Sequence, residues 1–344
     1  MNQLTIILTL KNRSNFTLRW MHYMNMNQCK YKIFIADGGD DKEIERILSN
    51  KNNYPNINYE YHRYPFDANL ECYFRKLNSI INLVNTKYVL QADNDDFFIL
   101  DEIPKFINFL EINEKHIGAR GSLVDLYYSG KNDSPKNPTC SKYFLKQIFS
   151  ESIELNEPLK RIEFLCDNIS KFDYYANWYC VFRTENLRKT WNKLMPLNIP
   201  NMIVVEMCMH IYMLNYGKIK VFNEPFYIRQ SGSSIHGDTL TEKNEFLESF
   251  FLQNFVKQLE IGLNAEETLD FEQNRTILLK SIASWFQIFN YNLYGSRVKV
   301  NNIKKKFVLL INYFKHQKTL KITSLDNYLL SKNVDYNLSK NALY

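Results

Sequence analysis

The sequence predicts an α/β protein with a doubly wound, Rossmann-like and mostly parallel sheet, because two stretches repeat the order strand, polar turn, helix. The first begins with Leu4–Leu10, a continuously apolar run that stops at a polar turn and precedes a helix-compatible pattern. The second begins with Tyr31–Ala36, which ends in Asp37 and two glycines before the apolar spacing of another helix. Connections of this kind bring the loops that follow the strands to one edge of the sheet.

Later stretches continue this pattern less regularly. Asn69–Val84 is the clearest amphipathic helix, because its apolar residues recur at spacings of three and four. We expect the other elements at these places: strands at Ile57–Tyr61, Ala119–Tyr128, Tyr174–Arg183 and Lys218–Phe222, one or two helices in residues 142–170, and an apolar helix over residues 203–217 that ends at Gly217.

The strand-like run of Tyr88, Val89 and Leu90 leads into an acidic cluster. The cluster consists of Asp93, Asn94, Asp95 and Asp96. Three carboxylates in four residues repel one another unless a cation lies among them. Mg²⁺ and Mn²⁺ prefer such oxygen ligands, often together with substrate phosphates. One interpretation is therefore a site for a metal ion and a diphosphate, and the other is a solvated acidic turn that caps the next helix.

Size and composition suit an ordinary globular protein. The 344 residues fit one large domain or one domain with an appendage, and 45% apolar residues are enough for a packed core. No run reaches the roughly 18–20 apolar residues of a membrane span, and the first residues lack the features of a signal peptide. We therefore expect a cytoplasmic protein. Its six cysteines are scattered without a Cys-X-X-Cys pair, which indicates reduced core residues rather than a zinc site or disulfide framework.

The net charge of +6 is concentrated near the C-terminus, because residues 291–344 hold ten Lys or Arg and only two Asp. This asymmetry makes nucleic acid or an anionic membrane surface a conceivable partner, and solvated lysines on a helical face are the commoner explanation. The cations are spread through apolar helices without a recognisable module, so we expect no nucleic-acid partner. Residues 245–344 suit peripheral contact with the inner face of a membrane, or packing in a homodimer.

Three charged residues on predicted helices are candidates for a site. Glu206 is the lone carboxylate of the helix over residues 203–217, where it either caps the helix or belongs to a site. Arg75 and Lys76 are the only cations on the amphipathic helix. These two cations either lie on the protein surface, or one of them contacts a diphosphate.

Taken together, these stretches resemble a family-2 glycosyltransferase of the GT-A fold over roughly residues 3–236. Four blocks occur in the family's order: Thr5–Arg13, Ile33–Asp41, Val89–Asp96, and Val205–Gly217 with Asn223–Ser234. They are similar to the strand that ends near Thr-Tyr-Asn-Arg, the strand that ends in Asp-Asp-Gly-Ser, the strand that runs into Asp-X-Asp-Asp, and the Glu-Asp helix with its closing Gly and Pro-X-Tyr-X-Arg segment. The resemblance implies a GT-A domain in residues 1–240 and a helical, basic C-terminal region in residues 241–344.

The resemblance also implies roles for individual residues. Asp37 would contact the nucleotide base, Asp93 would lie by the ribose, and Asp95 would bind the metal ion. His236 is a candidate second metal ligand, since neutral imidazole suits Mn²⁺, with a packing role in its loop as the alternative. The nucleotide sugar would be bound by ten residues in all: Thr9, Leu10, Lys11, Arg13, Asp37, Arg75, Lys76, Asp93, Asn94 and Arg229.

Two positions depart from the family's pattern. Glu206 stands eleven residues before Gly217, where the second acid of Glu-Asp is the catalytic base, and Val205 replaces the first acid. The base would therefore be Glu206, without its acidic neighbour, and Asp173 is the next candidate. Lys11 stands where an aromatic residue is usual, so the wall that contacts the nucleotide base is expected to differ.

The implied function is a metal-dependent, inverting glycosyltransferase that uses Mn²⁺ or Mg²⁺. It would move a sugar from a nucleotide-diphosphate donor, with UDP as the default, to a hydroxyl of a glycan, lipid-linked or protein acceptor. A sugar-phosphate nucleotidyltransferase is disfavoured, because residues 10–19 contain no glycine for a triphosphate-binding loop. A catalytically degenerate scaffold or glycan-binding protein is the other alternative.

Overall fold

The computed structural model describes residues 3–128, 143–168, 174–231, 249–270, 272–278 and 280–281. Strands and helices alternate along the first part of the chain, as the sequence predicts. These elements are β1 (Leu4–Leu10), α1 (Ser14–Met26), β2 (Lys32–Asp37), α2 (Lys42–Ser49), the 3₁₀ helix η1 (Lys51–Asn53), β3 (Tyr59–Arg63), α3 (Leu70–Leu83), β4 (Tyr88–Asp93), β5 (Phe97–Phe98), the 3₁₀ helix η2 (Leu100–Glu102) and α4 (Ile103–Ile112).

The second part of the chain adds longer strands and a layer of helices. Its elements are β6 (His116–Tyr128), β7 (Tyr143–Ile148), α5 (Pro158–Asn168), the 3₁₀ helix η3 (Tyr174–Tyr179), β8 (Val181–Arg183), α6 (Thr184–Leu194), the 3₁₀ helix η4 (Met195–Leu197), α7 (Met202–Tyr216), β9 (Lys218–Ser231) and α9 (Ser249–Asn264).

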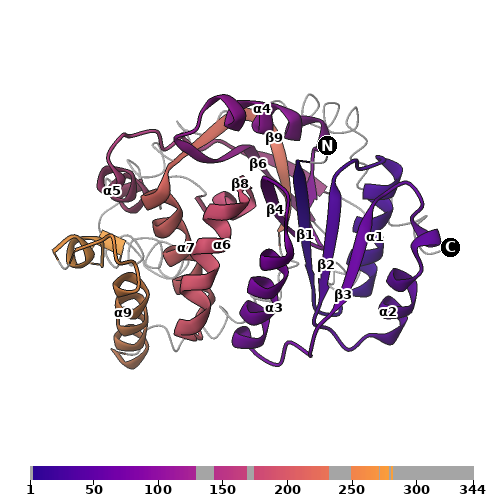
Figure 1. Cartoon of the computed structure of the whole chain (residues 1–344), viewed down its shortest axis with the longest axis horizontal. Coiled ribbons are helices and arrows are strands. Elements are labelled where there is room, and N and C mark those ends of the chain that lie inside the picture. The colour runs from indigo at the N-terminus through magenta and orange to yellow at the C-terminus, as the bar shows by residue number, and fades with distance from the viewer. Residues whose placement is uncertain are drawn as a thin grey trace, which may run out of the picture.

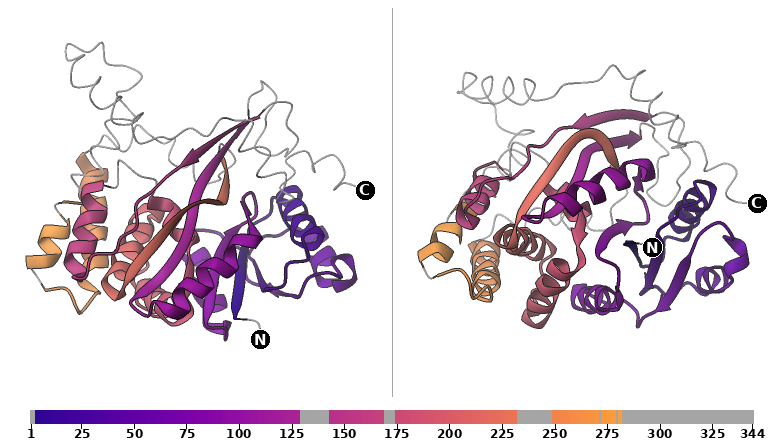
Figure 2. Two further views of the ribbon diagram at one scale, coloured as in Figure 1. Left: turned by 90° about the horizontal axis from the view of Figure 1, so that it is seen from above. Right: turned by 45° about the horizontal axis from the view of Figure 1, so that its top comes forward.

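Within the described residues, the strands form one curled, mostly parallel sheet in the order β3-β2-β1-β4-β8-β6-β9-β5, with β7 paired to β6 (Figure 1). Strands β1 to β4 are all parallel to their neighbours among themselves, and β8 runs antiparallel between β4 and β6. The predicted fold class is therefore confirmed. Figures 1 and 2 place α1 and α2 near one end of this sheet and α5 and α9 near the other.

The ends of the parallel strands are level with one another. Asp37 pairs in register with Leu10 on one side and with Arg63 on the other, and Thr9 pairs with Asp93. The loops after β1, β2, β3 and β4 therefore start from one carboxyl edge, where open α/β sheets place their ligands.

Helices cover both faces of the sheet, and side chains alternate between two cores. In β2, Ile33 and Ile35 belong to one core, together with Trp20 of α1, whereas Phe34 belongs to the other core with Trp191 of α6. Both faces of the parallel strands are thus apolar, which explains the continuous hydrophobic runs in the sequence.

Three predicted elements differ from the structure. Residues 143–148 form β7 instead of a helix, because they pair with the end of β6. Most of Tyr174–Arg183 forms η3 instead of a strand, and only Val181–Arg183 pairs with the sheet. The strand expected at Lys218–Phe222 continues to Ser231 in β9, because β6 offers it a parallel partner over that length.

Part of the predicted C-terminal region packs against the predicted GT-A domain. The Tyr212 hydroxyl of α7 donates to the Gly262 carbonyl of α9 at 2.5 Å, and Lys193 pairs with Glu266 at 3.1 Å. The division at residue 240 stays a prediction, since most of residues 241–344 lie outside the described part of the chain. None of the helices that the structure describes is long and apolar enough to cross a membrane.

Candidate functional site

The acidic loop after β4 is bound to the start of the chain. The Arg13 guanidinium pairs with the Asp95 carboxylate at 3.1 Å, and Arg19 donates to the Asp95 carbonyl at 2.8 Å. Asn94 donates to the Thr17 hydroxyl at 2.9 Å. Arg13 has a left-handed backbone (φ 58°, ψ 48°), and the same residue precedes the first turn of α1. Helix α1 therefore holds the loop from one side.

Two tyrosines from the second half of the chain hold the same loop from the other side. The Tyr179 hydroxyl donates to Asp93, and the Tyr227 hydroxyl donates to Asp96. The two rings are stacked, with centroids 3.9 Å apart and an interplanar angle of 20°. Asp96 also accepts a hydrogen bond from the backbone N–H of Gln230 at 2.7 Å. The spacing between the two acids is thus tied to a rigid aromatic pair.

Burial and mutual repulsion make these acids unusual. Burial and the charge of Asp95 raise the pKa of Asp93 to about 6. Burial, followed by the charges of Asp95 and Asp93, raises the pKa of Asp96 well above its ordinary value. A carboxylate cluster of this kind is stabilised by an added positive charge.

Asp37 is held by residues of the neighbouring strand and turn. One oxygen accepts from the Gly39 amide at 2.7 Å, and the other accepts from the Tyr61 hydroxyl at 2.6 Å and from Arg63 at 2.8 Å. Both oxygens therefore have partners within the protein. In this structure Asp37 shapes the turn after β2, and its contact with a nucleotide base stays a prediction.

Lys76 is buried, so the interpretation that it carries a surface charge is wrong. Its ammonium group pairs with Asp67 and donates to the Leu10 carbonyl at 2.7 Å, and both side chains of the ion pair are at most 2% exposed. The Leu10 carbonyl also accepts from the Gly38 amide at 3.0 Å, and the Asp67 amide donates to the Gly38 carbonyl at 2.8 Å. The pair thus joins the loops that follow β1, β2 and β3.

The two glycines after Asp37 are required by close packing. A Cβ atom on Gly38 would lie 2.4 Å from the Asp67 carboxylate, and one on Gly39 would lie 2.6 Å from the Asn12 backbone nitrogen. Any larger residue would push these loops apart. The Asp-Gly-Gly sequence therefore serves the contact between loops.

Tyr73 of α3 connects the acidic loop with Glu206. Burial is the main cause that raises the pKa of the Tyr73 hydroxyl, and the negative charges of Asp93 and Glu206 contribute to it. A hydrogen bond with Thr9 acts on the same group in the opposite direction. Glu206 is also the one residue between Ile203 and Leu214 that is not buried. The predicted base is thus partly exposed, and its charge acts on the same hydroxyl as that of Asp93.

The other predicted residues have different surroundings. The Lys11 ammonium lies over the Phe66 ring, 5.0 Å from its centroid. Arg75 pairs with Glu71 on the exposed side of α3, at 2.6 Å. Arg229 pairs with the buried carboxylate of Asp125, at 2.8 Å. His236 and Asp173 lie outside the described residues.

The donor set fits a cation only in part. Among the described residues no group of three or more His, Cys, Asp or Glu side chains is arranged to hold a metal ion. Asp93 and Asp95 supply hard oxygen ligands, and the charge of Asp95 acts on Asp93. Such a pair suits Mg²⁺ or Mn²⁺ that takes its remaining ligands from water and substrate phosphates. The residues therefore supply two carboxylates that could ligate a cation, and Arg13 is the present partner of Asp95.

Sequence reasoning missed four residues at this edge: Tyr73, Tyr179, Asp67 and Phe66. Tyr73 and Tyr179 have the aromatic patterns of core residues, and their contacts with acids depend on the fold. Asp67 and Phe66 lie in the loop after β3, where no motif marks them. Tyr227 belongs to the Pro-X-Tyr-X-Arg segment, whose sequence does not indicate the contact with Asp96.

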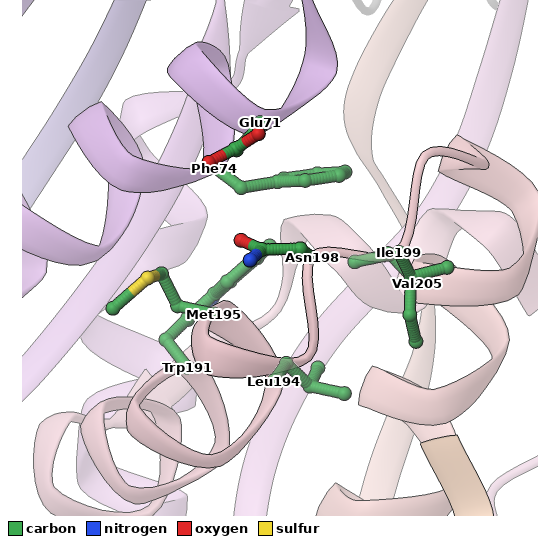
Figure 3. A pocket seen from close by; sticks show the side chains of 8 residues that line it. All are labelled: Glu71, Phe74, Trp191, Leu194, Met195, Asn198, Ile199 and Val205. Carbon is green, nitrogen blue, oxygen red and sulfur yellow. The ribbon is translucent and has the colours of Figure 1, made fainter. Parts of the chain in front are cut away.

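A small, largely apolar hollow lies between α3, α6, η4 and α7. Figure 3 shows Glu71 and Phe74 on one wall and Trp191, Met195 and Asn198 opposite them. Leu194, Ile199 and Val205 complete the lining, and none of the predicted site residues takes part in it. Phe74 and Val205 in the lining are the sequence neighbours of Tyr73 and Glu206, and Glu71 pairs with Arg75.

Comparisons with known proteins agree on the fold and give little at the level of sequence. No family model matches the chain. The ribosomal protein L11 methyltransferase of Clostridium botulinum is 23% identical over 128 residues, and this match spans 36% of the chain and 40% of the methyltransferase.

The structural likeness covers nearly the whole chain. The crystal structure of S. aureus TarS 1–349 has a TM-score of 0.52 and 13% identity, over 99% of this chain and 92% of that one. The complex of TarS 1–349 with UDP-GlcNAc has a TM-score of 0.52 and 12% identity, over 97% and 89%. These structures share the GT-A fold with this chain.

Proposed function

We propose that the chain is a metal-dependent, inverting glycosyltransferase. It transfers a sugar from a nucleotide-diphosphate donor to a hydroxyl of a glycan, lipid-linked or protein acceptor. UDP is the first donor nucleotide to test, because a TarS structure with this fold is a complex with UDP-GlcNAc.

The observation that carries the proposal is the convergence of acids around Tyr73. The register of β1 and β4 puts Thr9 beside Asp93, Thr9 bonds with Tyr73, and the charge of Glu206 reaches the same hydroxyl. An acidic loop suited to a cation and a diphosphate therefore lies near a separate, partly exposed carboxylate. A glycosyl transfer needs both parts, one for the leaving group and one for the attacking hydroxyl.

Different residues would hold the cation, position the acidic loop and stabilise the leaving group. Asp93 and Asp95 would hold the cation, and the stacked Tyr179–Tyr227 pair keeps the acidic loop in place. A divalent cation, when bound there, would offset the charge of the departing diphosphate. Arg13 lies within reach of the same carboxylate of Asp95 and would add positive charge at the leaving group.

Glu206 would accept the proton of the acceptor hydroxyl as the sugar is transferred. General bases contribute about 10²–10⁴ in rate when they lie within hydrogen-bond reach of the proton. Glu206 belongs to α7 and the acidic loop follows β4, so the proposed base and the proposed metal ligands come from different elements. A single displacement of this kind inverts the anomeric carbon.

Nucleotide binding tests the proposal most simply. Thermal unfolding is measured for the wild type and for Asp95→Asn with UDP, GDP or S-adenosylmethionine, each with Mn²⁺ and with a chelator. A ligand at one hundred times its Kd stabilises by about 2.7 kcal/mol. We expect a metal-dependent shift with UDP or GDP that Asp95→Asn loses and the exposed control Asp101→Asn keeps. A shift with S-adenosylmethionine alone, or none at all, would contradict the proposal.

A further inference from the structure

Phe66 is an exposed aromatic ring at the edge where the candidate site lies. Its exposed fraction is 46%, although the side chain is large and apolar. Met26, Leu83 and Ile112 are also exposed, but they lie at the ends of α1, α3 and α4, which lead back to the opposite edge of the sheet. Among the described residues of the first four strand–helix units, Phe66 is therefore the exposed large apolar side chain at the carboxyl edge.

The backbone on both sides of Phe66 is fixed to the end of β2. The Tyr64 amide donates to the Asp37 carbonyl at 2.8 Å, and the Asp67 amide donates to the Gly38 carbonyl at 2.8 Å. The loop is also connected to the end of β1, because Lys76 pairs with Asp67 of the loop and donates to the Leu10 carbonyl. The ring is thus presented on a rigid loop, which limits the entropy that a ligand must remove when it binds.

Lys11 completes the surface around the ring. Its ammonium lies 5.0 Å from the Phe66 centroid, where a cation interacts favourably with the ring electrons. Lys11 follows Leu10 at the end of β1, and Phe66 follows β3, so the two side chains come from the loops on either side of β2. They form an aromatic ring with a cation over one of its two faces, next to the turn that Asp37 shapes.

We propose that Phe66, with Lys11 beside it, is the wall against which the base of the donor nucleotide stacks. Every nucleobase offers a flat π-face, and an exposed aromatic ring on a fixed loop is a suitable partner for it. The ring supplies from the loop after β3 an aromatic contact that position 11 of this chain lacks. This inference rests on the proposed function and names the residue that recognises the base.

The test compares ligands with and without a base. Binding of UDP, GDP and inorganic pyrophosphate, each with Mn²⁺, is measured by calorimetry for the wild type, Phe66→Ala, Phe66→Tyr and the exposed control Leu83→Ala. We expect Phe66→Ala to weaken binding of UDP or GDP by roughly tenfold or more, because stacking on an aromatic ring is lost. Pyrophosphate binding should change less than about twofold. Phe66→Tyr keeps the ring and should keep the affinity, and Leu83→Ala should behave as the wild type.

Two results would overturn the inference while the proposed function stands. The first is wild-type nucleotide affinity in Phe66→Ala. The second is an equal loss for pyrophosphate, which would show that the variant disturbs the diphosphate site instead of base stacking. A wild-type protein that binds neither nucleotide would contradict the proposed function, and this inference with it.

Discussion

Two neighbouring parts of the carboxyl edge hold their acids in different ways. After β2 and β3, the acids are paired with cations, since Asp37 contacts Arg63 and Asp67 contacts Lys76. After β4, Asp95 pairs with Arg13, whereas Asp93 and Asp96 on either side of it are held by the phenols of Tyr179 and Tyr227. A cation neutralises the acid that it holds, whereas a phenol positions the acid without adding positive charge.

This difference separates the two parts by function. The cation-paired acids fix the loops that follow β1 to β3 and shape the surface around Phe66. The phenol-held acids keep their mutual repulsion, which contributes to the raised pKa values of Asp93 and Asp96. A divalent cation is therefore expected at the second part, and a neutral or weakly polar group such as a nucleobase at the first.

Loss of a cation partner should produce the largest effect on stability. Lys76→Met leaves Asp67 buried without its partner, and breaking a buried pair typically costs about 3–5 kcal/mol. The double variant Lys76→Met, Asp67→Leu removes both charges and should recover most of this loss. Arg75→Met, next to it on α3, breaks an exposed pair and should cost about 0.5 kcal/mol or less. Urea unfolding measures all three, and equal effects of the two single variants would contradict the distinction.

Loss of a phenol should produce a smaller effect. Tyr227→Phe keeps the stacked ring but removes the hydrogen bond to Asp96, which then retains the Gln230 amide. Removing one partner of a buried polar group typically costs about 1–3 kcal/mol, so we expect a loss in this range. Denaturant unfolding at neutral pH measures it. A variant as stable as the wild type would mean that the phenol does not hold the acid. Tyr179 is partly exposed, so Tyr179→Phe should lose less stability than Tyr227→Phe.

Burial is the main cause of the raised pKa values of Asp93 and Asp96, and His210 tests the same cause away from the site. Burial, assisted by the charge of Arg120, lowers the pKa of His210 from 6.5 to about 3. Between these values the unfolded chain binds a proton that the folded chain does not, so stability falls as the pH falls below 6.5. At pH 5.5 the loss from this residue is about 1.4 kcal/mol.

His210→Gln should remove this part of the pH dependence. Unfolding free energies at pH 7.5 and pH 5.5 measure it, with His22→Gln of α1 as the control. If the variant and the wild type lose the same stability between the two pH values, burial does not keep His210 neutral.

The sequence predicted the parallel part of the fold because its signals are local. Each run such as Leu4–Leu10 is apolar on both faces, and each is followed by a polar turn and a helix. The second half could not be read in this way. Whether Tyr143–Ile148 is a strand depends on pairing with β6, and the length of β9 depends on the same partner.

The acids of the candidate site stand out in the sequence, and their partners do not. Asp93, Asp95 and Glu206 stand out by charge in apolar surroundings. Tyr179 and Tyr227 lie 86 and 131 residues from the acids that they hold, so no local pattern connects them. The burial of Lys76 depends on Asp67, nine residues away in a loop. Partners of this kind become visible only when the strand ends are brought into register.

The most direct test of the central claim separates binding from turnover at Glu206. Release of UDP from UDP-GlcNAc and calorimetric binding of UDP, both with Mn²⁺, are compared for the wild type and Glu206→Gln. If Glu206 is the base, the variant should lose about 100-fold or more in turnover while its affinity for UDP stays within about threefold. Wild-type turnover in Glu206→Gln would contradict the account, because Glu206 would then not be the group that accepts the proton.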